Sequence, residues 1–382
     1  TSIAEEIGLG NRINMVMQSA FFKLANVIPV EDAVKYLKEA NVKSYGSKGE
    51  KIVAMNDKAV DAGIEKLVKF EIPESFKDAK DAAEGAAEEL PRFIKDILIP
   101  MNRQEGDSLP VSTFVGAEDG TFEAGSAAYE KRGIAVTVPE WQAANCIQCN
   151  QCSFVCPHAV IRPFLLTAEE KANAPEGFET IKAMGKGFEE LQYKIQVSTM
   201  DCTGCGNCAD VCPSKNKALV MKPLDTQVNK EVPNWNYAVK LPVKDDLMAT
   251  NTVKGSQFAQ PLFEFSGACA GCGETPYIKV VTQLYGDRMS IANATGCSSI
   301  WGGSAPSTPY CKNEEGKGPS WANSLFEDNA EFGMGMVLGN TAVRTLMKDK
   351  ALEFVGLNVD DAVKAPFAAW VEGLEDAKAS KE

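Results

Sequence analysis

Eight of the twelve cysteines in this chain of 382 residues form two runs with identical spacing. Each run reads C-x2-C-x2-C-x3-C-P, and its last cysteine is followed by Pro157 or Pro213. The runs consist of Cys146, Cys149, Cys152 and Cys156, and of Cys202, Cys205, Cys208 and Cys212. Thiolates spaced three residues apart let one tight loop surround three corners of an iron–sulfur cubane. The two runs therefore predict two [4Fe–4S] clusters and one-electron transfer.

The last cysteine of each run points away from its own loop and, in two-cluster iron–sulfur proteins, ligates the other cluster. We therefore expect one cluster to be held by Cys146, Cys149, Cys152 and Cys212. We expect the other to be held by Cys202, Cys205, Cys208 and Cys156. The alternatives are zinc and disulfide bonds. Zinc sites use pairs of Cys or His rather than two identical quartets, and disulfides need a secreted chain, for which no signal peptide is visible.

Composition indicates an intracellular protein of two to four domains. No apolar run is long enough to span a bilayer, and a net charge of −13 argues against nucleic acid as a partner. The cysteine content indicates a reducing, anoxic cytoplasm. The single histidine, His158, excludes Ser-His-Asp catalysis within this chain. We expect His158 to be an ordinary loop residue; the alternative is a hydrogen bond that tunes a cluster potential.

The first part of the chain shows helical patterns. Residues 12–24 place four apolar side chains on one face of a helix, namely Ile13, Met17, Phe21 and Leu24. A second helix is expected over residues 31–40, and a third is expected to begin at Asp57 as its N-cap. The alanine-rich, charged residues 78–90 predict an exposed helix. We expect residues 1–70 to be α/β.

A third cysteine group follows the two runs. Cys269 and Cys272 form a C-x2-C pair, and Cys297 is a distant third thiol. A four-thiolate centre needs one more ligand, and Cys311 is the only cysteine left. A zinc site and inert buried thiols are the alternatives, because C-x2-C pairs are common. The spacing does not decide which metal is present.

Seven stretches together resemble the pyruvate:ferredoxin oxidoreductases, the homodimeric thiamine-diphosphate enzymes of anaerobes. They are the two cysteine runs and residues 12–22, 130–135, 266–274, 295–300 and 324–333. A two-cluster electron carrier alone would lack every stretch outside the two runs. The resemblance is spread over residues 10–340.

The resemblance implies a multidomain α/β and α+β architecture. A ferredoxin-like domain with two [4Fe–4S] clusters would lie between the remnant of an α/β coenzyme A-binding domain and the start of a thiamine-diphosphate-binding α/β domain. The implied parts follow in chain order. Residues 1–75 are the end of the coenzyme A-binding domain, and residues 76–140 are a small linking domain. Residues 141–225 are the ferredoxin-like domain, residues 226–259 a linker, and residues 260–382 the start of the thiamine-diphosphate-binding domain.

The resemblance also implies a reaction and a third cluster. Pyruvate, coenzyme A and oxidised ferredoxin would give acetyl-CoA, carbon dioxide and reduced ferredoxin, with flavodoxin as an alternative acceptor. Thiamine diphosphate would act as the electron sink for decarboxylation, and three [4Fe–4S] clusters in series would carry electrons singly. The third cluster would be held by Cys269, Cys272 and Cys297, with its fourth ligand outside this chain rather than at Cys311.

By the same resemblance, Glu274 and Cys297 border the thiamine, while Asn14 and Asn56 contact coenzyme A. The Mg2+ ligands would lie outside this chain, since no G-D-G run occurs in it, and no catalytic residue is assigned. We therefore interpret the chain as an internal piece of a homodimeric enzyme, and expect it not to turn over pyruvate without the remainder. Two alternatives stay open: a relative acting on another 2-oxoacid, and a non-catalytic electron-transfer subunit.

Overall fold

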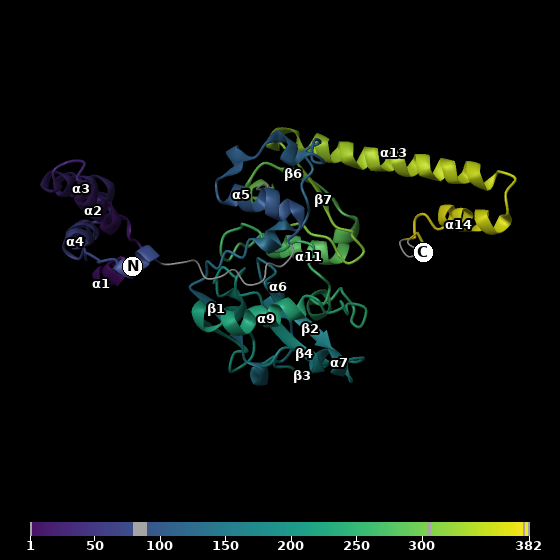
Figure 1. Ribbon diagram of the computed structural model, residues 1–382, viewed down its shortest axis with the longest axis horizontal. Helices are drawn as coiled ribbons and strands as arrows, with labels where there is room; N and C mark the ends of the chain where they lie inside the picture. The colour runs from purple at the N-terminus through teal and green to yellow at the C-terminus, as the bar shows by residue number, and fades with distance from the viewer. Residues whose placement is uncertain (1, 79–89, 304–306, 377–378, 381–382) are drawn as a thin grey trace. The chain divides into compact units, whose positions relative to one another are not determined.

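The computed structural model describes residues 2–78, 90–303, 307–376 and 379–380, and the chain divides into two compact units, residues 1–87 and 88–382 (Figure 1). The helix expected over residues 78–90 falls almost wholly outside the described residues. Within the described ranges, no helix is both long and apolar enough to cross a bilayer.

The first unit is helical. Its helices are α1 (Ser2–Ile7), α2 (Asn14–Ala25), α3 (Val30–Tyr45) and α4 (Glu50–Glu65). Helices α2 and α4 approach closely at Gly63, where an added Cβ would lie only 2.1 Å from Ser19 Oγ. The described residues 2–78 contain no strand, so the α/β character expected for residues 1–75 is not seen in this segment.

The helices at residues 12–24 and 31–40 are confirmed, but the N-cap is wrong. Of the apolar stripe of α2, Ile13 packs against the unit's core, whereas Met17, Phe21 and Leu24 are 59%, 58% and 73% exposed. Contact with α4 is made by the opposite side of the helix, at Ser19. Asp57 is not an N-cap: α4 begins seven residues earlier at Glu50, and Asp57 accepts a hydrogen bond from Asn41 Nδ2 at 2.9 Å.

The second unit opens with a π-helical turn, Ile94–Leu98, that continues into α5 (Ile99–Asn102). A small apolar core forms there, in which the rings of Phe93 and Phe122 meet edge to face at 5.8 Å. The chain then reaches strand β1 (Thr137–Trp141), which pairs antiparallel with β5 (Leu219–Pro223).

Both cysteine runs lie between β1 and β5. Strands β2 (Ile161–Leu166), β4 (Gln192–Val197) and β3 (Ile181–Lys182) form an antiparallel sheet in the order β2-β4-β3. Three short helices lie in this part: α6 (Gln151–Phe154), α7 (Ala168–Ala172) and α8 (Asn207–Val211). Helix α9 (Val228–Ala238) follows β5 and contacts β4 (Figure 1). The core between these elements includes Leu165, Phe188, Tyr193 and Trp235.

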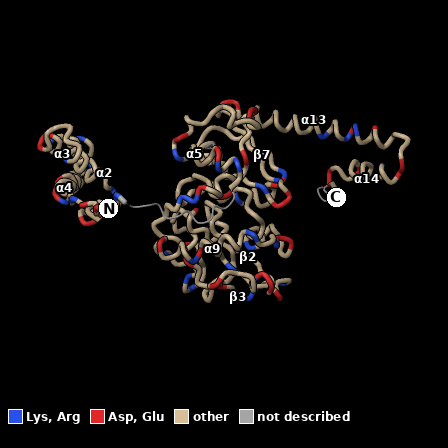
Figure 2. Tube along the Cα trace, viewed as in Figure 1, with Lys and Arg blue, Asp and Glu red and all other residues tan. Residues whose placement is uncertain are grey.

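The last part contains a parallel strand pair with helices around it. Strands β6 (Ser290–Ala294) and β7 (Ser320–Ser324) are in parallel register. Helices α10 (Val253–Ser256), α11 (Thr275–Tyr285) and α12 (Cys297–Gly303) precede or separate these strands. Helix α13 (Asn329–Val355) packs on α14 (Asp361–Glu372). Figure 2 shows few charged residues along the first half of α13.

Candidate metal centres

The eight cysteines of the two runs gather around two separate small cavities. Site A is the cavity lined by Cys146, Cys149, Cys152 and Cys212. Site B is the cavity lined by Cys156, Cys202, Cys205 and Cys208. Each site thus takes three cysteines from one run and the last cysteine of the other. This grouping is the one that the spacing predicts.

The two binding loops share a local conformation. The Gln148 amide donates to Cys146 Sγ at 3.4 Å, and the Gly204 amide donates to Cys202 Sγ at the same distance. Both donors have positive φ, 56° and 70°, which turns the amide back toward the sulfur two residues earlier. At Cys212 a third amide, that of Ala218, donates at 3.3 Å. Such bonds stabilise a thiolate and are one means by which a protein sets a cluster potential.

Each site also holds one buried polar nitrogen that lacks a hydrogen-bond partner among the described residues. At site A it is Trp141 Nε1. Burial raises the pKa of the nearby Cys146 thiol, and the indole N–H of Trp141 offsets part of this rise. At site B it is Nε2 of His158, whose other nitrogen, Nδ1, lies 3.1 Å from the Ser266 carbonyl oxygen. His158 lies in a turn, as expected, and is 2% exposed, so it is a buried loop residue that lines site B.

The donor set suits iron–sulfur clusters better than single ions or disulfides. All twelve cysteines are free thiols. No group of three or more ligand-type residues in the described part of the chain converges closely enough to hold one metal ion. A cubane has its irons at separate corners, so its thiolates surround a space and do not meet at a point. Burial raises the pKa of Cys152 and Cys208, and that of Cys202 to about 12, because a thiolate is poorly solvated inside these cavities.

The Cys269–Cys272 turn of the third cysteine group lies beside site B. Gly271, within the Cys269–Cys272 turn, is so close to site B that an added Cβ would lie 3.6 Å from Cys205 Cβ. The turn is closed by a hydrogen bond from the Cys272 amide to the Cys269 carbonyl oxygen at 3.0 Å. Cys297, which begins α12, is exposed, and no described contact joins it to this turn. Glu274 lies directly before α11 and near Tyr310. Burial raises the pKa of the Tyr310 phenol, and the negative charge of Glu274 raises it further.

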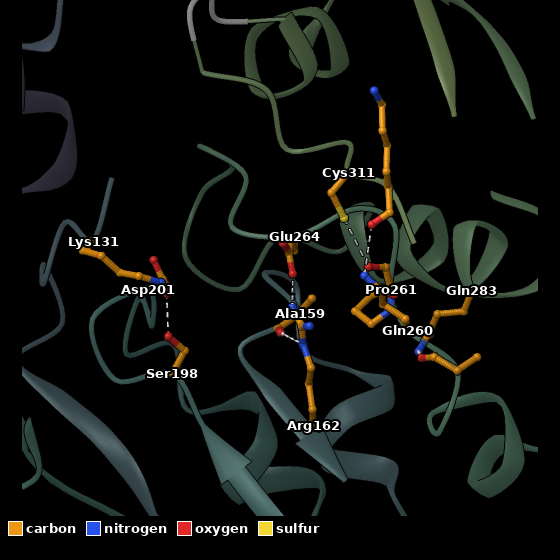
Figure 3. Close-up of polar contacts among 12 residues, drawn as sticks. Lys131, Ala159, Arg162, Ser198, Asp201, Gln260, Pro261, Glu264, Gln283 and Cys311 are labelled. Carbon is orange, nitrogen blue, oxygen red and sulfur yellow. Dashed lines mark hydrogen bonds and ion pairs between the residues drawn. The ribbon is translucent and has the colours of Figure 1, made fainter. Parts of the chain in front are cut away.

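Cys311 lies elsewhere. Its Sγ points at the Pro261 carbonyl oxygen, 3.5 Å away, and burial raises its pKa (Figure 3). Nearby, Arg162 of β2 forms a buried ion pair with Glu264 and donates to the Ala159 carbonyl oxygen at 2.9 Å (Figure 3). The pair joins the strand after site B to the segment that leads to Cys269. Sequence reasoning missed it, because residues 102 positions apart give no local signal.

The residues proposed for coenzyme A lie on two helices of the first unit. Asn14 is the exposed first residue of α2. Asn56 lies inside α4, is 8% exposed, and donates from Nδ2 to the Ile52 carbonyl oxygen at 2.9 Å. No hydrogen bond between the two residues is present in the described part of the chain.

Residues 130–137, which we call the clamp, contact the loop of site B at residues 200–204. Lys131 Nζ lies 2.6 Å from Oδ2 of Asp201, a carboxylate with 3% of its side chain exposed that also accepts from Ser198 (Figure 3). The Gly133 amide donates to the Met200 carbonyl oxygen at 2.8 Å. Further on, a Cβ at Gly204 would lie 2.8 Å from the Thr137 carbonyl oxygen. Lys131 Nζ also lies 4.8 Å from the centre of the Phe265 ring.

Replacement of Lys131 by methionine is expected to weaken site B selectively. In the variant, Ser198 is the one side-chain donor left to the buried Asp201 carboxylate among the described residues. A hydrogen bond to a charged group contributes more than a neutral one. We expect iron to be released from site B to a chelator about tenfold faster, with site A unchanged. Lys350→Met, at an exposed ion pair with Glu353, is the matched control. Equal release from both sites, or none beyond the control, would count against the clamp.

Two family models match parts of the chain. A 4Fe–4S dicluster domain matches residues 145–216, and a domain of unknown function matches residues 79–135, which include most of the clamp. A ferredoxin-like 4Fe–4S dicluster domain, which contains the two cysteine-lined cavities, is therefore present within a fold of mixed α and β.

Curated relatives match the whole chain. It is 57% identical over 384 residues to a pyruvate-flavodoxin oxidoreductase of Enterobacter agglomerans, and 57% identical over 380 residues to a pyruvate:ferredoxin oxidoreductase of Moorella thermoacetica. A pyruvate-flavodoxin oxidoreductase of Klebsiella pneumoniae is 53% identical over 380 residues. Each match covers 100% of this chain and 32% of the relative. The chain is a member of this family, as the motifs predict, and spans about a third of the length of these relatives.

Proposed function

We propose that this chain is the electron-transfer part of an enzyme that oxidises pyruvate with coenzyme A to acetyl-CoA and carbon dioxide. The electrons pass singly through three [4Fe–4S] clusters to ferredoxin or flavodoxin. The observation that carries the proposal is the pair of cavities, each lined by four cysteines drawn from both runs. The names of the relatives support pyruvate as the substrate and a small carrier protein as the acceptor.

The reaction requires a relay that divides an electron pair. Pyruvate and coenzyme A give acetyl-CoA, carbon dioxide, one proton and two electrons, whereas each cluster takes one electron at a time. Thiamine diphosphate, when bound, supplies the electron sink for decarboxylation. We infer the order from the contacts: electrons enter at the Cys269–Cys272 turn, cross to site B beside Gly271, and continue to site A.

Sites A and B are joined directly by the chain. Cys152 lines site A and Cys156 lines site B, and only one helical turn separates them. The same holds for Cys208 of site B and Cys212 of site A, at the two ends of α8. We propose that the short chain segments from Cys152 to Cys156 and from Cys208 to Cys212 form the covalent link between the two clusters.

The remaining assignments are also proposals. Cys269, Cys272 and Cys297 would hold the third cluster with a ligand from outside this chain, and Glu274 and Cys297 would border the thiamine. The exposure of Cys269 and Cys297 leaves them accessible to such a ligand. Asn14 and Asn56 would contact coenzyme A, Mg2+ would be bound outside this chain, and the enzyme would act as a cytoplasmic homodimer.

The full-length enzyme, purified without oxygen, tests the proposed activity. We expect reduction of ferredoxin or flavodoxin to require both pyruvate and coenzyme A, with two carriers reduced for each acetyl-CoA formed. Higher kcat/KM with 2-oxoglutarate or an aryl pyruvate would instead support a relative with another substrate. Reduced carriers passing electrons through the protein, with no 2-oxoacid turned over, would support a non-catalytic electron-transfer subunit.

A further inference from the structure

A lysine is buried at the junction of sites A and B. Lys279, on α11, is 1% exposed, although no carboxylate among the described residues pairs with it. Its Nζ donates to the carbonyl oxygens of Ser153, Phe154 and Cys156, the last two at 3.1 and 3.3 Å. These carbonyls lie at the end of α6, between the site A ligand Cys152 and the site B ligand Cys156.

The three acceptors require a charged side chain. An ammonium group has three N–H donors and no acceptor, so it satisfies three carbonyl oxygens fully. A neutral amine would turn its lone pair toward one of them. A buried positive charge is costly unless it is compensated, and cluster thiolates supply negative charge on both sides.

We propose that Lys279 is a junction cation that raises the reduction potentials of the clusters in both site A and site B. The proposal rests on the iron–sulfur function proposed above. Each cluster gains one electron, and therefore one negative charge, on reduction. A fixed positive charge in a buried setting stabilises the reduced form more than the oxidised form. It also offsets the repulsion between two neighbouring reduced clusters, so the second electron enters more easily.

The same helix provides a matched neutral control. Gln283 lies one turn after Lys279 on α11 and accepts from Gln257 at 3.0 Å, while Gln257 in turn accepts from Ser153 Oγ at 2.9 Å. Gln283 therefore also ties α11 to the α6 turn, but without a charge. A role for Lys279 that is only structural would be shared by Gln283, whereas an effect of charge would not.

The test is a redox titration of the full-length enzyme, followed by electron paramagnetic resonance of each cluster. In Lys279→Met we expect the ratio of reduced to oxidised cluster at a fixed potential to fall about tenfold at both sites, equivalent to a shift of about 59 mV for one electron. Lys279→Arg is expected to retain the wild-type potentials, and so is Gln283→Leu. If Lys279→Met does not assemble its clusters, Lys279→Gln, which keeps two donors but no charge, is expected to show the same fall.

Two results would overturn the proposal. One is an unchanged potential in Lys279→Met or Lys279→Gln with both clusters present by iron content. The other is an equal shift in Gln283→Leu, because that shift would come from loosening of the α6 turn. Wild-type protein without two ferredoxin-type clusters would refute the proposed function itself, so failure of the two proposals can be told apart.

Discussion

Cys156→Ala is expected to abolish the cluster of site B, although Cys156 belongs to the first cysteine run. Its side chain lines the same cavity as Cys202, Cys205 and Cys208. Loss of one of four thiolates leaves an iron corner without its protein ligand, so the variant should lose up to about four irons per chain or retain a three-iron remnant. Iron and sulfide content and the paramagnetic signal of each cluster measure this outcome.

The reciprocal variant and a control sharpen the result. Cys212→Ala should remove the cluster of site A and leave that of site B, since Cys212 lines the cavity of the first run. Cys311→Ala should leave every cluster intact, because its sulfur contacts the Pro261 carbonyl oxygen instead. If Cys156→Ala removes the site A signal and spares site B, each run holds its own cluster and the crossed arrangement is wrong.

Arg162→Met is expected to destabilise the second unit by about 3–5 kcal/mol. Arg162 and Glu264 each have 13% of the side chain exposed, so removal of the arginine leaves a largely buried carboxylate without its partner. The arginine also lies 5.1 Å from the Trp235 ring and 5.5 Å from that of Phe265 (Figure 3 shows the pair itself). The measurement is the denaturant midpoint of the second unit, followed through its tryptophan fluorescence.

The control for this variant is another arginine ion pair. Arg288 and Asp287 are 60% and 32% exposed, and exposed pairs contribute about 0–1 kcal/mol. Arg288→Met should therefore change the midpoint little. Replacing both partners, with Arg162→Met and Glu264→Leu together, should recover part of the loss, because no buried charge remains. Equal effects of Arg162→Met and Arg288→Met would contradict the account.

The cysteine runs could be interpreted from the sequence because the relation between spacing and ligation is local. Three thiols at intervals of three residues must lie on one loop, and the fourth must point elsewhere. The partner loop was predicted by analogy, and the structure brings Cys156 to Cys202 and Cys212 to Cys146. His158 lies in a loop as expected, but its burial against the segment of Ser266 is not visible in the sequence.

The failures have a common physical cause. Periodicity in residues 12–24 correctly predicts a helix, but it does not tell which surface covers Phe21, which is 58% exposed here. Lys279 would be taken for a solvent-facing residue of an amphipathic helix, and Lys131 for part of a charged turn. Their roles depend on carbonyl and carboxylate partners at least 70 residues away, which no local pattern encodes.

The iron and acid-labile sulfide content of the oxygen-free, full-length protein tests the central claim most directly. The account predicts about twelve irons and twelve sulfides per chain, of which about eight belong to sites A and B. Eight irons with one zinc would mean that the third cysteine group is a zinc site. Protein free of iron, with its cysteines joined in disulfides or bound to zinc, would contradict the account as a whole.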